Sequence, residues 1–263
     1  MIQTQGIPTP RRPLTILEAC VDSTESAIIA ADAGADRVEL CADLIEGGTT
    51  PSAGSVAAAV NNVDADVMVM IRPRGGDFVY NQRELDIMRR DAEIAGELGA
   101  TGVTLGCLTV DGNIDGNATR PLVEAARPMT VTFHRAFDVS RDPFESLKHL
   151  VQLDIDRLLT SGQQPSAIQG LDLIGELVAH AADQIIVMPG VGINSGNIIK
   201  VAMTTGAREF HIYTERRRAS TMRFRRGDIP MGRSYEPNEY VVCEPDAAEI
   251  EAVAQVLHRS LTG

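Results

Sequence analysis

The sequence predicts a single-domain α/β protein of the (β/α)8 class, a TIM barrel. Eight short apolar segments have the character of strands, helix signals lie between them, and the 263-residue chain has no linker or composition break. Eight strand–helix units in about 250 residues are typical of this barrel. The alternative is a doubly wound open sheet, which usually has fewer strands and a glycine-rich turn after its first strand. Here Asp22-Ser23 follows the first segment, which favours the barrel.

The predicted strands are rich in β-branched or apolar residues. In chain order they cover residues 15–21, 37–42, 67–72, 102–108, 129–135, 156–162, 184–190 and 208–214. We expect residues 1–13 to form a short tail and residues 14–263 to form the barrel domain.

Capping residues indicate helices between these strands. Asp142-Pro143 places proline in a first helical turn, and Asn194-Ser195 can cap the helix after the seventh strand. Strand and helix therefore alternate along the chain.

The composition excludes several classes of partner. The chain has 36 acidic and 24 basic side chains and a formal net charge of -12, whereas nucleic acids and anionic membranes require a basic surface. Its four cysteines include no C-x-x-C pair, and no apolar run reaches the roughly 18 residues of a membrane helix. We therefore expect a cytoplasmic protein with reduced cysteines and no nucleic-acid or membrane partner.

Strand alternation predicts two carboxylates and two thiols at the barrel mouth. Barrel strands point alternate side chains into the lumen, and catalytic groups lie where the strands end. By this parity Glu18 and Cys20 face the lumen from the first strand, and Glu39 and Cys41 from the second. With level strands Cys20 and Cys41 would be neighbours, but the stagger of the barrel is not visible in the sequence.

The same parity predicts other polar residues in the lumen. His134 faces it from the fifth strand, Glu209 and His211 from the eighth, and Arg72 lies at the end of the third. Cys107 has the parity of its apolar neighbours, which predicts a buried structural thiol. Buried carboxylates require cations or donors nearby, so a purely structural ion-pair network is one interpretation and a functional site is the other.

Glycines after the seventh strand suggest an anion site. The segment 188–197, MPGVGINSGN, includes Gly190, Gly192, Asn194 and Ser195 and leads into a helix, which is where barrels commonly bind phosphate. A tight turn that needs positive φ is the alternative explanation.

Several motifs resemble one known family. LEACVDS, RVELCADLIEGGTTPS, MIRPRGGDFVY, VTFHRAFD, LTSG, VMPGVGI and EFH, in this order, are similar to the CutC family of copper homeostasis proteins, from about residue 15 to MRFRRGDIPMG. The resemblance implies a TIM barrel, a cytoplasmic location, dimers or higher homo-oligomers, and Cu(I) binding. The ligands that it implies are Cys20 and Cys41, and no organic cofactor is expected.

Two functions from different classes therefore stay open. Soft thiolates suit Cu(I), which supports a copper-binding protein. The other candidate is an enzyme for a small anionic or phosphorylated metabolite, with Glu18 or Glu39 as general base and His134 or His211 as proton partner.

In that enzyme Arg72 and Arg74 would hold the anion. Another basic run, between residues 215 and 226, is expected to be a solvated loop or an oligomer contact, or less often an anion-binding lid.

Overall fold

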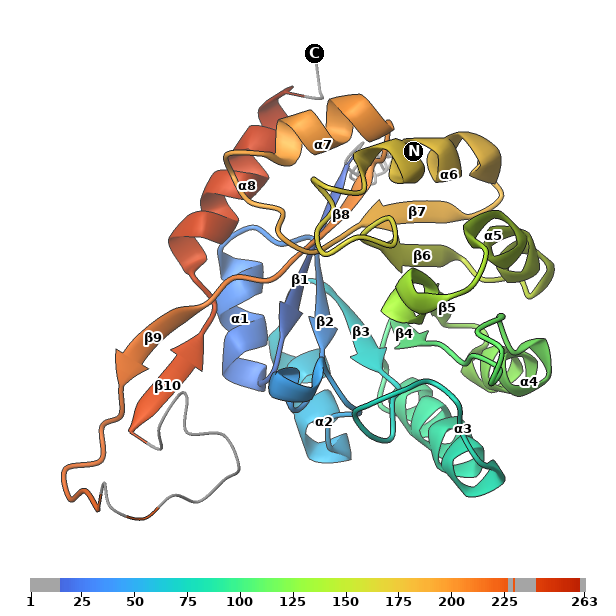
Figure 1. The fold of residues 1–263 in the computed structure, drawn as a ribbon. Helices are drawn as coiled ribbons and strands as arrows, with labels where there is room; N and C mark the ends of the chain where they lie inside the picture. Colours follow the sequence, from blue (N-terminus) through green and yellow to red (C-terminus); the bar gives the residue numbers. More distant parts are fainter. Residues whose placement is uncertain (1–14, 227–228, 230–239, 261–263) are drawn as a thin grey trace, which may run out of the picture.

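The structure is a computed structural model that describes residues 15–226, 229 and 240–260. The predicted tail, residues 1–13, lies outside the described residues. Eight parallel strands form one sheet in the order β7-β6-β5-β4-β3-β2-β1-β8, and β7 lies beside β8, which brings the two ends of the sheet together (Figure 1). The predicted barrel is confirmed.

The barrel strands are short and close to the predicted segments. They are β1 (Ile16–Val21), β2 (Arg37–Leu40), β3 (Asp66–Met70), β4 (Gly102–Leu105), β5 (Thr130–Phe133), β6 (Arg157–Thr160), β7 (Ile186–Pro189) and β8 (Glu209–Ile212).

Helices surround the barrel. They are α1 (Thr24–Asp32), α2 (Ala53–Asn62), α3 (Gln82–Glu97), α4 (Gly116–Ala126), α5 (Pro143–Gln152), α6 (Leu171–Ala181), α7 (Ile198–Thr205) and α8 (Ala247–Ser260). Two short 3-10 helices, η1 (Leu44–Glu46) and η2 (Arg135–Val139), follow β2 and β5. None of the helices in the described ranges is long and apolar enough to cross a membrane.

Local sequence explains where these helices begin. Asp142 caps α5 by accepting from the Phe144 and Glu145 N–H groups, with Pro143 in the first turn as predicted. The helix after β7 begins later than predicted, because Asn197 rather than Asn194-Ser195 is the residue before α7. The intervening residues form a turn in which the Asn194 carbonyl accepts from the Asn197 and Ile198 N–H groups.

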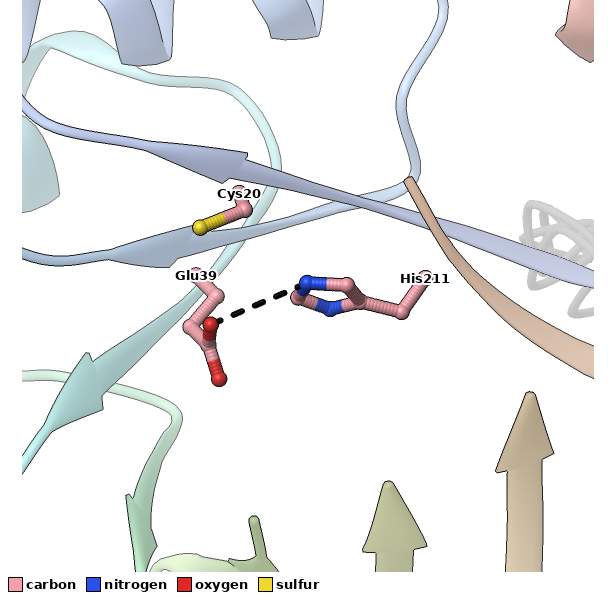
Figure 2. Close-up of side chains that lie close together, drawn as sticks. All are labelled: Cys20, Glu39 and His211. Carbon is pink, nitrogen blue, oxygen red and sulfur yellow. Dashed lines mark ion pairs between the residues drawn. The ribbon is translucent and has the colours of Figure 1, made fainter. Parts of the chain in front are cut away.

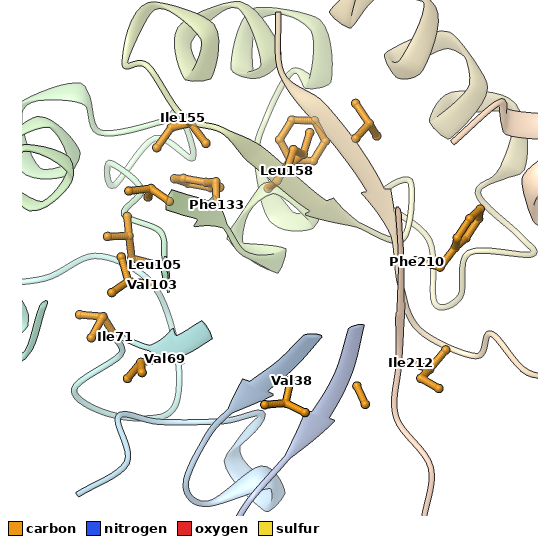
Figure 3. Packing of buried hydrophobic residues seen from close by; sticks show 14 of the residues in the cluster. Val38, Val69, Ile71, Val103, Leu105, Phe133, Ile155, Leu158, Phe210 and Ile212 are labelled. Carbon is orange, nitrogen blue, oxygen red and sulfur yellow. The ribbon is translucent and has the colours of Figure 1, made fainter. Parts of the chain in front are cut away.

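The hydrophobic core lies between the strands and the helices. Figure 3 shows Val38, Val103 and Phe210 among side chains on the outer face of the barrel, and each is fully buried. Cys107 packs in the same core, which confirms the structural position predicted from its parity. Burial of apolar area on this outer face stabilises the fold. The buried charged side chains lie on the other face of the strands, in the lumen.

Strands β1 and β2 are staggered rather than level. Glu18 pairs with Arg37 and Cys20 pairs with Glu39, an offset of two residues from the level arrangement. The offset places an arginine beside the deeper carboxylate and a carboxylate beside the first thiol. Barrel closure sets this shear.

A β-hairpin projects from the barrel between β8 and α8. Its strands β9 (Arg216–Ala219) and β10 (Val241–Glu244) are antiparallel, and in Figure 1 they extend past α1. Residues 215–244 had no predicted strands, because three consecutive arginines give β9 no apolar alternation. The exposed residues of β9 leave this hairpin outside the hydrophobic core.

Candidate functional site

Five of the predicted site residues meet at the carboxyl ends of β1, β2 and β8. They are Glu18, Cys20, Glu39, Cys41 and His211, and we call them the mouth cluster. In Figure 2 the side chains of Cys20, Glu39 and His211 point toward one another from three strands, and one ligand atom from each lies within 4.8 Å of the other two.

His211 lies between the two carboxylates. Its Nδ1 is 2.7 Å from Glu18 Oε1, and its Nε2 is 3.9 Å from Glu39 Oε2. Burial opposes a charge on the imidazole, but Glu39, Cys20 and Glu18 outweigh it and raise the pKa of His211 well above its usual range. Gly190 makes room for the ring, since a Cβ there would lie 3.4 Å from His211 Cδ2 and 2.6 Å from Leu159 Cδ1.

Arg37 stabilises the ionised form of Glu18. The Arg37 Nε donates to Glu18 Oε2 at 2.5 Å, and Glu18 is fully buried. Burial alone would favour the neutral acid, but Arg37 and the bond to His211 hold the pKa of Glu18 well below its usual range. A carboxylate that orients a histidine in this way is common behind metal-binding imidazoles.

The two cysteines are close together and chemically different. Their sulfurs are 4.0 Å apart, and both thiols are free. The contact with Cys41, opposed by burial and assisted by His211, lowers the pKa of Cys20 to about 6. The same contact, together with burial, raises the pKa of Cys41 well above its usual value. Near neutral pH the pair therefore holds one thiolate and one thiol.

The pKa of Glu39 is shifted in the opposite direction to the pKa of Glu18. Burial, followed by the charges of Cys20 and Glu18, raises its pKa to about 8, although His211 acts against this rise. Its Oε2 accepts from the Cys41 thiol at 3.7 Å. Glu39 is therefore mainly protonated at neutral pH, while Glu18 is ionised.

Soft donors and backbone surround Cys41. A Cβ on Gly48 would lie 3.1 Å from Cys41 Sγ and 3.6 Å from Met70 Cε, and Gly48 has a φ of +88°. The loop after β2 therefore covers the Cys41 sulfur, and the Met70 thioether ends nearby.

The base of the β9–β10 hairpin lies beside Cys20, which stays partly exposed. Residues leaving β8, Tyr213 and Thr214, and residues returning from β10, Cys243 and Pro245, line a void of about 10 Å³ with Cys20. This volume is at the lower limit for one water molecule.

Sequence parity missed the cations beneath the mouth cluster. Arg37 bridges Glu18 and Glu209, and Arg157 donates to Glu209 at 2.5 Å. Arg37 shares the parity of Glu39, so the alternation of β2 could have identified it. A cavity of about 470 Å³ opens at the opposite end of the barrel, where Arg37, Arg157 and Glu209 line it. Barrels use that end mainly for stability.

Arg72 and His134 lie together on the other side of the mouth. Arg72 donates to the carbonyl oxygens of Glu46, Gly48 and Gly76, so its terminal nitrogens bind two loops. Burial and the Arg72 charge lower the pKa of His134 to about 3, which leaves the ring neutral.

Arg74 lies outside the mouth cluster. Its guanidinium pairs with Glu84 at 2.6 Å and with Asp77 at 3.3 Å, at the start of α3. Its assignment to anion binding stays a prediction, and binding an anion would require exchange of these partners.

In the predicted anion segment, a carboxylate of the protein already accepts from the donors of Ser195. Glu249 on α8 accepts from the Ser195 N–H at 2.6 Å and from its hydroxyl at 3.1 Å. The Asn194 and Gly196 N–H groups donate to Asn side chains, and the Asn197 side chain donates to the Gly192 carbonyl. A phosphate at this loop would have to displace these contacts, so the site stays a prediction.

The arginine-rich segment forms ion pairs on the surface. Arg216 and Arg218 pair with Glu244 across the hairpin, and Arg217 pairs with Glu215. This arrangement suits a solvated element, and the structure contains no partner chain that would test an oligomer contact.

Fold and site define a class: a (β/α)8 barrel with paired thiols, two carboxylates and a histidine at the carboxyl ends of its strands. The CutC family model matches residues 15–215. The chain belongs to the CutC family.

Individual proteins of this family are similar to the chain over most of its length. A CutC family protein of Parabacteroides distasonis is 47% identical over 238 residues, which cover 90% of this chain and 98% of that protein. A copper homeostasis protein cutC homolog of Homo sapiens is 44% identical over 238 residues, covering 90% of this chain and 87% of that protein. The crystal structure of a CutC copper homeostasis protein from Streptococcus agalactiae has a TM-score of 0.72 at 36% identity, covering 75% of this chain and 98% of that one.

Proposed function

We propose that this CutC family member takes part in copper homeostasis by binding Cu(I) through Cys20 and Cys41. The observation that carries the proposal is the 4.0 Å separation of two free sulfurs at the barrel mouth. This is less than twice a metal–thiolate bond of about 2.3 Å, the length in zinc sites, so both sulfurs can reach one ion without moving. Thiolates are the ligands that Cu(I) prefers.

The surroundings of the sulfur pair support a soft cation. Cys20 is already ionised near neutral pH, and the Met70 methyl group lies on the same side of the mouth as Cys41, next to Gly48. His211 presents Nε2 toward Cys20 and Glu39 while Glu18 holds its Nδ1, which is the orientation of a metal-binding imidazole. Copper is the transported or stored ion in this proposal. Cys20 and Cys41 are its candidate ligands, and His211 becomes a third when Cu(I) displaces the proton from its Nε2.

An anaerobic Cu(I) titration against a competing chelator tests the proposal. The Cys20→Ser/Cys41→Ser variant should lose tight binding, because a hydroxyl is a poor ligand for a soft ion. Cys107→Ala is the matched control, since Cys107 lies in the outer core and should leave binding unchanged. Tight binding by the double variant would exclude these cysteines as the site.

An enzyme is the second candidate, and one observation favours it. The pKa values of Glu18 and Glu39 are displaced in opposite directions around a shared histidine, a pattern typical of acid–base pairs. The substrate would be a small anionic or phosphorylated metabolite. Glu39→Gln should then abolish turnover of a metabolite found by thermal-shift screening, and the double cysteine variant should retain it. Retained turnover in Glu39→Gln would exclude this role.

Location and assembly belong to the same proposal. A cytoplasmic location without a nucleic-acid or membrane partner fits the net charge of -12 and the free cysteines. The homodimer or higher homo-oligomer is what the resemblance to the CutC family implies. Light scattering at several protein concentrations tests the assembly, and a monomer at all of them would contradict it.

A further inference from the structure

Four buried polar atoms of the lumen have no hydrogen-bond partner. They are Glu39 Oε1, Arg72 Nε, Thr104 Oγ1 and His134 Nε2, out of six such side-chain atoms in the described part of the chain. Each of these residues is at most 5% exposed. They come from β2, β4 and the ends of β3 and β5, which are consecutive strands of the sheet. Unpartnered buried polar atoms are rare in folded proteins, so their concentration here indicates a place where water or a ligand supplies the partners.

Two of the four atoms, His134 Nε2 and Arg72 Nε, are donors. His134 Nδ1 accepts from the Ala136 N–H at 3.2 Å, so the neutral ring carries its proton on Nε2. Arg72 uses its terminal nitrogens on three backbone carbonyls, and among the described residues its Nε–H has no hydrogen-bond partner within 3.5 Å, although the Tyr80 hydroxyl lies close enough to interact with this side chain. The Phe78 ring packs against both, 5.2 Å from the Arg72 guanidinium carbon and 5.0 Å from the His134 ring. Two donors, one of them cationic, therefore lie beneath Phe78.

The other two atoms, Thr104 Oγ1 and Glu39 Oε1, are oxygens that can accept a hydrogen bond. Thr104 lies two residues before Gly106 on the same face of the chain, and a Cβ on Gly106 would be 2.6 Å from His134 Nδ1. The imidazole thus lies over Gly106, next to Thr104. Glu39 is close enough to Thr104 for the hydroxyl to affect its carboxyl group. A ligand hydroxyl both donates and accepts, so it can pair with Glu39 Oε1 and with the Thr104 hydroxyl whichever partner supplies the proton.

We propose that these four atoms bind a small hydroxy acid beneath the loop between β3 and α3. The carboxylate accepts from Arg72 Nε and His134 Nε2, and the hydroxyl group binds Thr104 and Glu39. The site shares only Glu39 with the mouth cluster and does not depend on copper binding.

The donor pattern suits a carboxylate. Two N–H donors, one of them cationic, match its two oxygens. Phe78 is half-buried over the site, so we expect the ligand to enter when this loop moves.

Thermal shift and calorimetry with glycolate, acetate and ethylene glycol test the proposal. The wild type should bind glycolate about five- to tenfold more tightly than acetate, since acetate lacks the hydroxyl and leaves Thr104 and Glu39 unpaired. Ethylene glycol, which lacks the carboxylate, should not bind measurably.

Thr104→Val removes the hydroxyl without removing an intramolecular hydrogen bond. It should fold normally, bind Cu(I) like the wild type, and bind glycolate no better than acetate. Thr119→Val is the matched control, because Thr119 is a fully buried threonine on α4 whose hydroxyl also lacks a partner. The control should keep the glycolate preference.

The wild-type measurements alone can refute the site. Absence of a shift with glycolate or acetate at tens of millimolar, or a crystal structure grown with glycolate that shows only ordered water beside the four atoms, would overturn the proposal. A glycolate preference that survives Thr104→Val would overturn it as well.

Discussion

Replacing Arg37 with methionine should destabilise the barrel strongly. The guanidinium joins Glu18 at 2.5 Å and Glu209 at 2.6 Å, and its side chain is 5% exposed. Methionine has a similar length but no donor, so both carboxylates lose their shared cation. Removing one partner of a buried ion pair leaves a charge that water cannot solvate.

The structure sets the magnitude of this effect. Such a removal typically costs about 3–5 kcal/mol. Glu209 still has Arg157, and Glu18 still has His211, so we expect the lower end, about 3 kcal/mol of unfolding free energy. For a chain of this size the melting temperature should fall by about 6–12 °C.

Urea unfolding followed by far-UV circular dichroism measures the loss, since the chain has no tryptophan. Arg89→Met is the matched control: its ion pair with Glu93 is also 2.5 Å long, but Arg89 is 51% exposed. That control should lose less than about 1 kcal/mol.

The pH dependence gives a second check. The folded pKa of Glu18 lies below its unfolded value, so its stabilisation is present above the unfolded pKa and is lost as the pH falls toward the folded pKa. The Arg37→Met deficit should be largest near pH 7 and shrink below about pH 4.5. A deficit like that of Arg89→Met at pH 7 would refute the electrostatic account of the lumen.

Three further predictions concern the mouth and its loops. Alkylation of Cys20 by iodoacetamide, followed by mass spectrometry, should have a rate midpoint near pH 6, and Cys41→Ala should raise it; an unchanged midpoint would contradict the thiol–thiolate contact. Gly190→Ala should lower stability by about 1–3 kcal/mol in urea, because its Cβ would lie 2.6 Å from Leu159, and an unaffected variant would show that this contact relaxes freely. Glu249→Ala should bind inorganic phosphate more tightly than the wild type in calorimetry, because it frees a backbone donor, and equal affinity would count against that competition.

Much of this architecture could be predicted from sequence. Period-two alternation correctly assigned Glu18 and Glu39 to the lumen and Cys107 to the outer core, because helices cover one face of every strand. Asp142-Pro143 identified a helix start because a cap and a ring constraint act locally. Such features depend on neighbours in the chain.

The remaining features depend on closure of the ring. The two-residue offset that pairs Cys20 with Glu39 arises from the shear of all eight strands, and no local pattern encodes it. Likewise, Glu249 reaches Ser195 from 54 positions away. The Asn194-Ser195 cap was wrong because a locally hydrogen-bonded turn, with Ser195 bound to Glu249, precedes α7.

The hairpin base beside Cys20 should affect how fast a ligand of the thiol pair exchanges, but not how tightly it binds. Affinity depends on the donor atoms, whereas the passage beside Tyr213 and Cys243 has room for about one water. The Cys20 side chain is partly exposed, and an incoming ion or reagent reaches it beside these residues. Substitutions at Tyr213 or Cys243, which line this void, should therefore alter association and dissociation rates together and leave the equilibrium constant of the thiol pair nearly unchanged.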